Sequence, residues 1–360
     1  MILVFSACGT LNRPNGTVGQ EVMENQAVQV DVENTLSENH VNEATQTPSP
    51  QEPDVIKPTI VCTIFPHYDW TRQILGERVD DFNLVLLGNR IDLHNYQPSI
   101  DDIVTITASD LFIYNGGKSD GWVMDVLKNA VNPDMMVVNL LEALFFADGA
   151  DVILSHGHDD DFDDGHSGCG SHQNECDEDI EINDLDEHIW LSLTNAAFLS
   201  RVITNNIIKL DPDHRDIYEA NLSEFLEQIS TLKTRYHEAV NNADNRTLVF
   251  ADRFPFRYLI DEYNLKHYSA FPGCSAETEA SFDTIIFLAG KIDTLGLTNV
   301  VVTESSDQSI AATIINATSL KDQTIYVLDS LQSLTSTEAG LMTYLDIMER
   351  NLTALMEILR

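Results

Sequence analysis

Residues 212–241, PDHRDIYEANLSEFLEQISTLKTRYHEAVN, form a long stretch of helix-forming residues that contains few breakers. Asp211-Pro212 separates this stretch from another predicted helix over residues 195–209. A helix of about 30 residues spans about 45 Å, which is long enough to run the length of two domains. The stretch therefore predicts a helical connection between two folded lobes.

Short apolar strands alternate with helices on both sides of this connection, which is typical of parallel βαβ units. Before it, strands are predicted over 60–65, 83–87, 111–114 and 135–140, and helices over 66–77, 99–107 and 122–130. After it, strands are predicted over 247–251, 267–271, 299–303 and 324–328, and helices over 255–264, 279–295, 308–318 and 338–359. The predicted fold class is α/β, with two similar lobes of mostly parallel sheet joined by one long helix.

The chain divides into five predicted regions. They are a truncated lipoprotein signal (1–8), a disordered acidic tether (9–57), an N-terminal lobe (58–210) with a His/Asp-rich loop (155–187), a linking helix (211–243) and a C-terminal lobe (244–360). Because ligands of parallel sheets sit beyond the carboxyl ends of the strands, a cleft between the lobes is expected to be lined by the loops that follow the strands.

The N-terminus indicates membrane attachment. Small residues precede Cys8 in the sequence MILVFSACGT, and this pattern is typical of a bacterial lipobox whose cysteine is lipidated. The following polar and acidic stretch cannot bury enough apolar area to order itself, so it is expected to act as a tether. The alternative is a short apolar N-terminus with an incidental cysteine. The sequence contains no run of eighteen apolar residues, so no transmembrane helix is predicted.

The charge balance favours cations. The formal net charge is −38, from 58 acidic and 20 basic side chains. Such a surface repels nucleic-acid phosphates and anionic lipid headgroups, so neither is an expected partner, and membrane contact is expected through the lipid anchor only. The five cysteines are odd in number and widely spaced, which does not indicate a disulfide framework.

One loop concentrates metal-binding side chains. No lysine or arginine occurs between Lys128 and Arg201, and this gap contains SHGHDDDFDDGHSGCGSHQNECDEDIEINDLDEHIW, residues 155–190. Imidazole and thiolate suit zinc, and carboxylates neutralise its charge. The loop therefore predicts weak metal sites at His156, His158, His166 and His172. The alternative is a disordered acidic insertion whose histidines occur by chance.

Three isolated residues are candidates for a tighter site. His94 follows the second predicted strand, His188 lies just past the His/Asp-rich loop, and Asp329 ends a predicted strand. A metal held by both lobes would close the cleft, because the ion bridges groups that are otherwise too far apart.

The motifs TIFPHYDWTRQILG, LLGNRIDLHNYQPS, ASDLFIYNGG, DEHIWLS and KLDPDHRDIYEANL, taken in order, resemble the zinc and manganese solute-binding lipoproteins of ABC importers, known as cluster A-I. The His-rich acidic insertion before DEHIW is similar to that of the zinc branch. The resemblance covers roughly residues 58–360. It implies a C-clamp of two lobes with a rigid linking helix, and His94, His188 and Asp329 at the positions of metal ligands.

The sequence departs from the family at one ligand position. Ala251 stands where the family has a third ligand, His or Glu, at the end of the first strand of the second lobe. Candidates for a substitute are His67 and Glu304, followed by Cys274. Asp252 is adjacent, but it would point away if the strand pleat continues.

The resemblance implies an extracytoplasmic, lipid-anchored or periplasmic protein that is not an enzyme. It would act as a monomer, bind zinc as its transported ligand, with manganese as the second choice, and deliver it to an ABC transporter permease. The alternatives are a manganese or iron carrier, a metal-dependent adhesin of the same fold, and a zinc hydrolase. No HExxH pair or nucleophile elbow supports the hydrolase.

Overall fold

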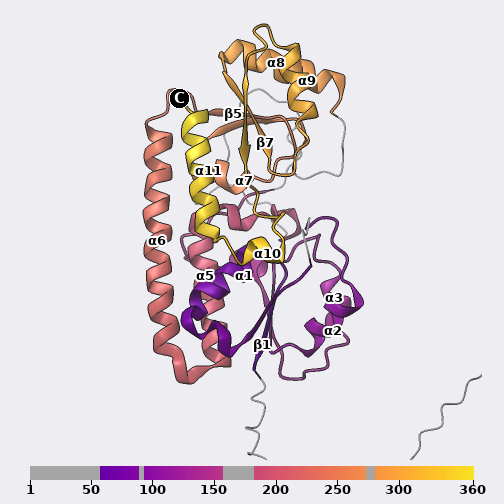
Figure 1. The fold of residues 1–360 in the computed structure, drawn as a ribbon, viewed down its shortest axis with the longest axis vertical. Coiled ribbons are helices and arrows are strands. Elements are labelled where there is room, and N and C mark those ends of the chain that lie inside the picture. Colours follow the sequence, from indigo (N-terminus) through magenta and orange to yellow (C-terminus); the bar gives the residue numbers. More distant parts are fainter. Residues whose placement is uncertain (1–56, 89–92, 157–181, 272, 274–279) are drawn as a thin grey trace, which may run out of the picture. The chain divides into compact units, whose positions relative to one another are not determined.

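The computed structural model describes residues 57–88, 93–156, 182–271, 273 and 280–360 (Figure 1). These residues belong to one compact unit, Val55–Arg360. Within the described residues, no helix combines the length and the apolar character that crossing a lipid bilayer requires.

The first half of the unit contains a four-stranded parallel sheet in the order β2-β1-β3-β4. Its strands are β1 (Thr59–Cys62), β2 (Asn83–Leu86), β3 (Leu111–Tyr114) and β4 (Met136–Asn139). The connecting helices are α1 (Phe65–Leu75), α2 (Ile100–Ala108), α3 (Val123–Leu127) and α4 (Leu140–Phe145). The two central strands are buried along almost their whole length, which explains their continuous apolar sequences.

The second half repeats this topology with strands in the order β6-β5-β7-β8, again all parallel. These strands are β5 (Thr247–Phe250), β6 (Lys266–Ser269), β7 (Asn299–Thr303) and β8 (Thr324–Leu328). The helices among them are α7 (Arg257–Glu262), α8 (Phe282–Leu295) and α9 (Ser309–Ala317). The α/β fold with two parallel sheets is therefore confirmed.

Two long helices connect the sheets along the chain. Helix α5 (Leu193–Leu210) is followed by a 3-10 turn (Pro212–His214) and by the 27-residue helix α6 (Arg215–Asn241). Helix α6 packs against α1, α5 and α11 (Tyr344–Ile358), as Figure 1 shows for α11. Its buried side chains lie three, four or seven residues apart, as expected for one apolar stripe: Tyr218, Phe225, Ile229, Leu232, Tyr236 and Val240.

The structure differs from the predicted elements in one helix that is divided and one that was not predicted. Residues 338–359 do not form one helix, because α10 (Ser336–Ala339) ends at Gly340 and α11 starts anew after Thr343. The Thr343 hydroxyl accepts from the backbone N–H of Asp346, and the Asp346 carboxylate accepts from that of Thr343, which fixes the new start. Helix α4 was not predicted; it follows β4 without a connecting loop, and the Asn139 side chain caps it by accepting the Glu142 backbone N–H.

Candidate metal centre

His94 and His188 meet in the structure, although 94 positions separate them in the chain. His94 lies in the loop after β2, and His188 directly precedes a 3-10 helix (Ile189–Leu191). Their Nε2 atoms are 3.3 Å apart and their ring centroids are 5.2 Å apart. His188 is almost fully buried, whereas a quarter of the His94 side chain is exposed. The two Nε2 atoms therefore lie close together at a position that is only partly open to solvent.

A buried carboxylate fixes the orientation of His188. The Asp186 Oδ1 atom lies 2.8 Å from His188 Nδ1 and accepts the backbone N–H of His188 at 2.8 Å. Burial alone raises the pKa of Asp186, but the His188 ring and these hydrogen bonds outweigh it and hold the pKa below its usual value. Because an ionised carboxylate can only accept, His188 carries its proton on Nδ1 and turns a lone pair on Nε2 toward His94.

His94 is also held through Nδ1, which lies 2.9 Å from the Ser119 Oγ atom and 3.6 Å from Glu187 Oε2. The sequence alone did not predict a role for Ser119, Asp186 or Glu187. Asp186 and Glu187 could have been found as carboxylates next to a candidate ligand, whereas only the folded chain brings Ser119 to His94.

The spacing of the two Nε2 atoms suits a tetrahedral metal. Zinc–nitrogen bonds of about 2.0–2.1 Å at a tetrahedral angle put two nitrogen ligands roughly 3.3–3.4 Å apart. The 3.3 Å observed here lies in that range. Imidazole nitrogens with hydrogen-bonded partner nitrogens are the donor set that late first-row metals prefer.

Two predicted carboxylates lie together at the carboxyl ends of β7 and β8. Glu304 accepts hydrogen bonds at 2.8 Å from the Ser330 backbone, the Ser330 hydroxyl and the Ser333 hydroxyl. Asp329 accepts one from the Leu331 backbone N–H at 2.8 Å. Burial and the nearby Glu304 raise the pKa of Asp329 to about 6.

The loop that carries Asp329 contacts the segment that carries His188. The Trp190 indole N–H donates to the Ser330 carbonyl oxygen at 2.9 Å. Trp190 lies two residues after His188, and Ser330 directly follows Asp329. Across the described part of the chain, however, no three His, Cys, Asp or Glu side chains are grouped so that they could hold a metal ion.

Ala251 is buried in an apolar cluster beside the second sheet. The neighbouring Asp252 carboxylate accepts from the Thr303 backbone N–H at 3.1 Å and from its hydroxyl at 2.7 Å. It also accepts the Arg253 N–H at 2.8 Å. Asp252 therefore links the end of β5 to the end of β7.

His67 lies in the first turn of α1 and is fully buried. Neither of its ring nitrogens has a hydrogen-bond partner among the described residues. Burial lowers its pKa to about 3, so the ring is neutral.

The His/Asp-rich loop is described only at its ends. His156 forms an isolated antiparallel bridge with Leu185, and the Asp186 N–H donates to the Ser155 carbonyl oxygen at 2.9 Å. The base of the insertion is therefore closed beside His188. Cys8, residues 9–56 of the predicted tether, His158, His166, His172 and Cys274 lie outside the described residues.

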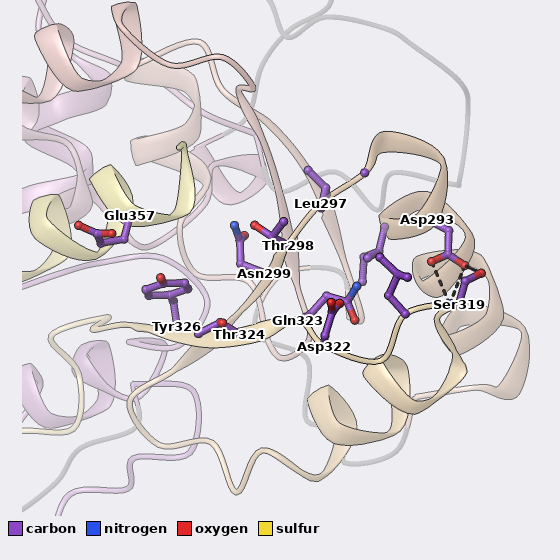
Figure 2. A pocket seen from close by; sticks show the side chains of 13 residues that line it. Asp293, Leu297, Thr298, Asn299, Ser319, Asp322, Gln323, Thr324, Tyr326 and Glu357 are labelled. Carbon is purple, nitrogen blue, oxygen red and sulfur yellow. Dashed lines mark hydrogen bonds between the residues drawn. The ribbon is translucent and has the colours of Figure 1, made fainter.

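A pocket of about 360 Å³ lies elsewhere, at the amino ends of β7 and β8 (Figure 2). Asp293, Asp322 and Glu357 line it, and the Asp293 carboxylate accepts the Ser319 N–H at 3.0 Å and the Ser319 hydroxyl at 2.7 Å. Because Glu304 and Asp329 follow the opposite ends of the same strands, this pocket is separate from the candidate metal centre.

The family model of a periplasmic protein, component A of a zinc-uptake complex, matches residues 60–358. The zinc-binding lipoprotein AdcA of Streptococcus pneumoniae is 28% identical over 302 residues, which are 83% of this chain and 55% of that protein. The chain thus spans about half the length of this relative. The high-affinity zinc uptake system protein ZnuA of Bacillus subtilis is 26% identical over 83% of this chain and 87% of its own length.

Solved structures share the fold. The metal-dependent lipoprotein YcdH of Bacillus subtilis is 25% identical and superposes with a TM-score of 0.65 over 84% of this chain and 99% of its own. The zinc-bound ZnuA-like domain of Streptococcus pneumoniae AdcA has a TM-score of 0.63 at 24% identity, over 84% and 99% of the two chains. At that identity the second likeness concerns the fold alone.

Proposed function

The chain belongs to the family of periplasmic zinc-uptake components, and from this premise we propose that it captures a zinc ion between His94 and His188 and delivers it to an ABC importer. The family is defined by uptake rather than by catalysis. The bound ion is cargo, so the site must hold it tightly and still release it to the permease.

The convergence of the two histidines carries the proposal. If each neutral ring holds its proton on Nδ1, its Nε2 atom carries a lone pair that can bind a metal. The two Nε2 lone pairs then face each other across 3.3 Å. Two lone pairs at that distance repel unless a cation lies between them, so the arrangement favours metal binding. A pair of imidazole ligands prefers zinc to manganese, because manganese binds carboxylate and water ligands better.

We propose Asp329 as a further ligand, supplied from the C-terminal lobe. The Trp190–Ser330 hydrogen bond supports this assignment, because it holds the Asp329 loop against the segment of His188. Glu304 already accepts three hydrogen bonds, so zinc would compete with all of them. His67 and Cys274 remain the other candidates for the ligand that Ala251 cannot provide.

We propose that the His/Asp-rich loop collects metal weakly and passes it to the centre. The closure of its base by His156–Leu185 and Ser155–Asp186 supports this role, because both ends of the insertion start beside His188. Deletion of residues 157–181 is expected to remove the weak sites and to leave the tight one.

The test is zinc titration of the purified protein by calorimetry and by competition with a chelator of known affinity. We expect one tight site, and we expect His94→Ala and His188→Ala each to weaken it by at least a hundredfold. His214→Ala is the matched control, because this histidine is part-exposed and pairs with Asp211 at 2.9 Å outside the site. Wild-type affinity in either site variant, or a tight site that disappears with the loop, would refute the assignment.

We further propose that Cys8 is lipidated and that residues 9–57 tether the folded unit to the membrane. Mass spectrometry of the protein from a native membrane tests this, because a diacylglyceryl group on Cys8 adds a defined mass. An unmodified Cys8 in the mature protein would contradict it.

A further inference from the structure

We infer that Glu187, acting through Ser119, sets the proton position on His94 and is a positioning residue of the metal centre. The inference concerns the zinc-free protein directly. Its consequence for metal affinity rests on the function proposed above. Glu187 directly precedes His188, so adjacent carboxylates, Asp186 and Glu187, orient the two histidines of the pair.

The direction of the hydrogen bonds follows from counting donors. The Ser119 hydroxyl has one proton, and it donates that proton to Glu187 Oε2. The Ser119 oxygen, 2.9 Å from His94 Nδ1, is then left as an acceptor. His94 must therefore carry its proton on Nδ1, which leaves a lone pair on Nε2 for the metal.

These hydrogen bonds exclude the other tautomer of His94, in which Nε2 carries the proton. If His94 instead carried its proton on Nε2, it would donate across the 3.3 Å contact to His188 Nε2, and the two rings would hydrogen-bond to each other. Zinc would then have to displace that proton before it could bind. The Glu187–Ser119 contact holds the pair open for the ion.

The surrounding backbone is built around the Glu187 carboxylate. The Ser119 backbone N–H donates to Glu187 Oε1 at 2.9 Å, and the Asn115 side-chain amide donates to the Glu187 carbonyl oxygen at 2.8 Å. Gly117 has φ +85, and a Cβ atom there would lie 2.5 Å from Glu187 Oε1. Only glycine at position 117 lets the carboxylate reach Ser119. Glu187 is 8% exposed, so solvent competes little for these bonds.

Nitrogen-15 NMR of the zinc-free protein tests the tautomer. Long-range proton–nitrogen spectra distinguish an Nδ1–H ring from an Nε2–H ring, and His94→Ala assigns the signals. We expect His94 to be the Nδ1–H form in the wild type and the Nε2–H form to gain population in Glu187→Gln and Ser119→Ala. An Nε2–H ring in the wild type, or an unchanged ring in both variants, would overturn the inference.

Zinc competition assays on the same variants measure the consequence. Loss of such supporting hydrogen bonds typically weakens metal binding by about 10–100-fold, and we expect that range for Glu187→Gln and Ser119→Ala. Ser119→Thr retains the hydroxyl and is expected to bind like the wild type. Glu224→Gln, at an exposed position of α6, makes the same charge change away from these contacts and should have no effect.

The outcomes separate the two proposals. If the wild type binds zinc through both histidines while Glu187→Gln and Ser119→Ala bind equally well, the inference fails and the proposed function stands. If the wild type binds no zinc, the proposed function fails and the tautomer spectra still decide the inference. Equal losses in Ser119→Thr and Ser119→Ala would show that side-chain shape, not the hydroxyl, matters, which also overturns it.

Discussion

The polar ring of His67 is fully buried. The residue lies in the first turn of α1, and its ring centroid is 5.7 Å from that of Trp70. Neither ring nitrogen has a hydrogen-bond partner among the described residues. A charged imidazolium is strongly disfavoured there, which is why burial lowers the pKa to about 3. The unfolded chain, with an ordinary histidine pKa near 6.5, takes up this proton at much higher pH.

Protonation of His67 should therefore favour unfolding in acid. Between about pH 6.5 and pH 3 the unfolded state binds one more proton at this site, so stability falls as the pH falls, by up to about 1.4 kcal/mol per pH unit. We expect His67→Leu to flatten the stability profile over this range. Urea unfolding in the presence of a chelator, from pH 7.5 to pH 4, measures it.

His214→Leu is the control, because its side chain is part-exposed. Parallel profiles for the wild type and His67→Leu would show that burial of His67 does not govern the pH dependence. The same variant has a second use, since a loss of tight zinc binding in His67→Leu would identify His67 as the substitute for the ligand missing at Ala251.

At the scale of elements, short polar signals decide where helices begin. Ser99 caps α2 and Thr343 caps α11, and in both cases an aspartate three residues later returns the hydrogen bond to the backbone of the cap. Helix α11 packs against α6 and α1, so its start must be placed correctly for the two halves to fit.

Thr343→Ala should destabilise the protein by about 1 kcal/mol, because it removes the acceptor for the Asp346 backbone N–H. Thr353→Ala is a matched control in the same helix, where the exposed hydroxyl donates to the Glu349 carbonyl oxygen at 3.0 Å. The control should be neutral or slightly stabilising, because alanine has the higher helix propensity. Chemical denaturation compares the two, and equal effects would argue against the capping role.

At the scale of the whole unit, a few hydrogen bonds link segments that are far apart in the chain. Arg72 of α1 donates to the carbonyl oxygens of Ala339 at 2.8 Å and Met342 at 2.9 Å, and it pairs with the fully buried Asp69. The second carboxylate oxygen of Asp69 accepts the Tyr344 N–H at 2.8 Å. The turn between α10 and α11 is thereby fixed to the middle and the last turn of α1.

Arg72→Ala should destabilise the protein by about 3 kcal/mol, because it leaves the Asp69 carboxylate buried without its cation. Arg235→Ala removes an exposed pair with Glu349, whose side chains are 47% and 42% exposed, and should cost less than about 1 kcal/mol. Differential scanning calorimetry measures both. A loss for Arg72→Ala no larger than for the control would mean that the buried pair does not hold the turn.

The sequence predicted the elements best where one kind of residue dominated. The bounds predicted for β3, β7 and β8 coincide with those observed, since each is a short run rich in β-branched or aromatic residues. Helix α4 was missed because LLEALF follows β4 without a connecting loop, and Asn139, which caps the helix, was not recognised as its start. The break before α11 was missed because no proline marks it, and the cap at Thr343 becomes decisive only when Tyr344 reaches Asp69.

The order of the strands and of most helices, and the histidines put forward as ligands, followed from the sequence alone, because periodicity and motif spacing are local properties of the chain. Which ring nitrogens face each other was decided only by the tertiary structure. The contacts that decide it join residues 94 positions apart for His94 and His188 and 68 positions apart for Ser119 and Glu187. A hydrogen bond fixes the position of a proton only when both partners are held in place. Here the fold holds them, because it brings the loops after β2 and β3 against the segment that carries Glu187 and His188.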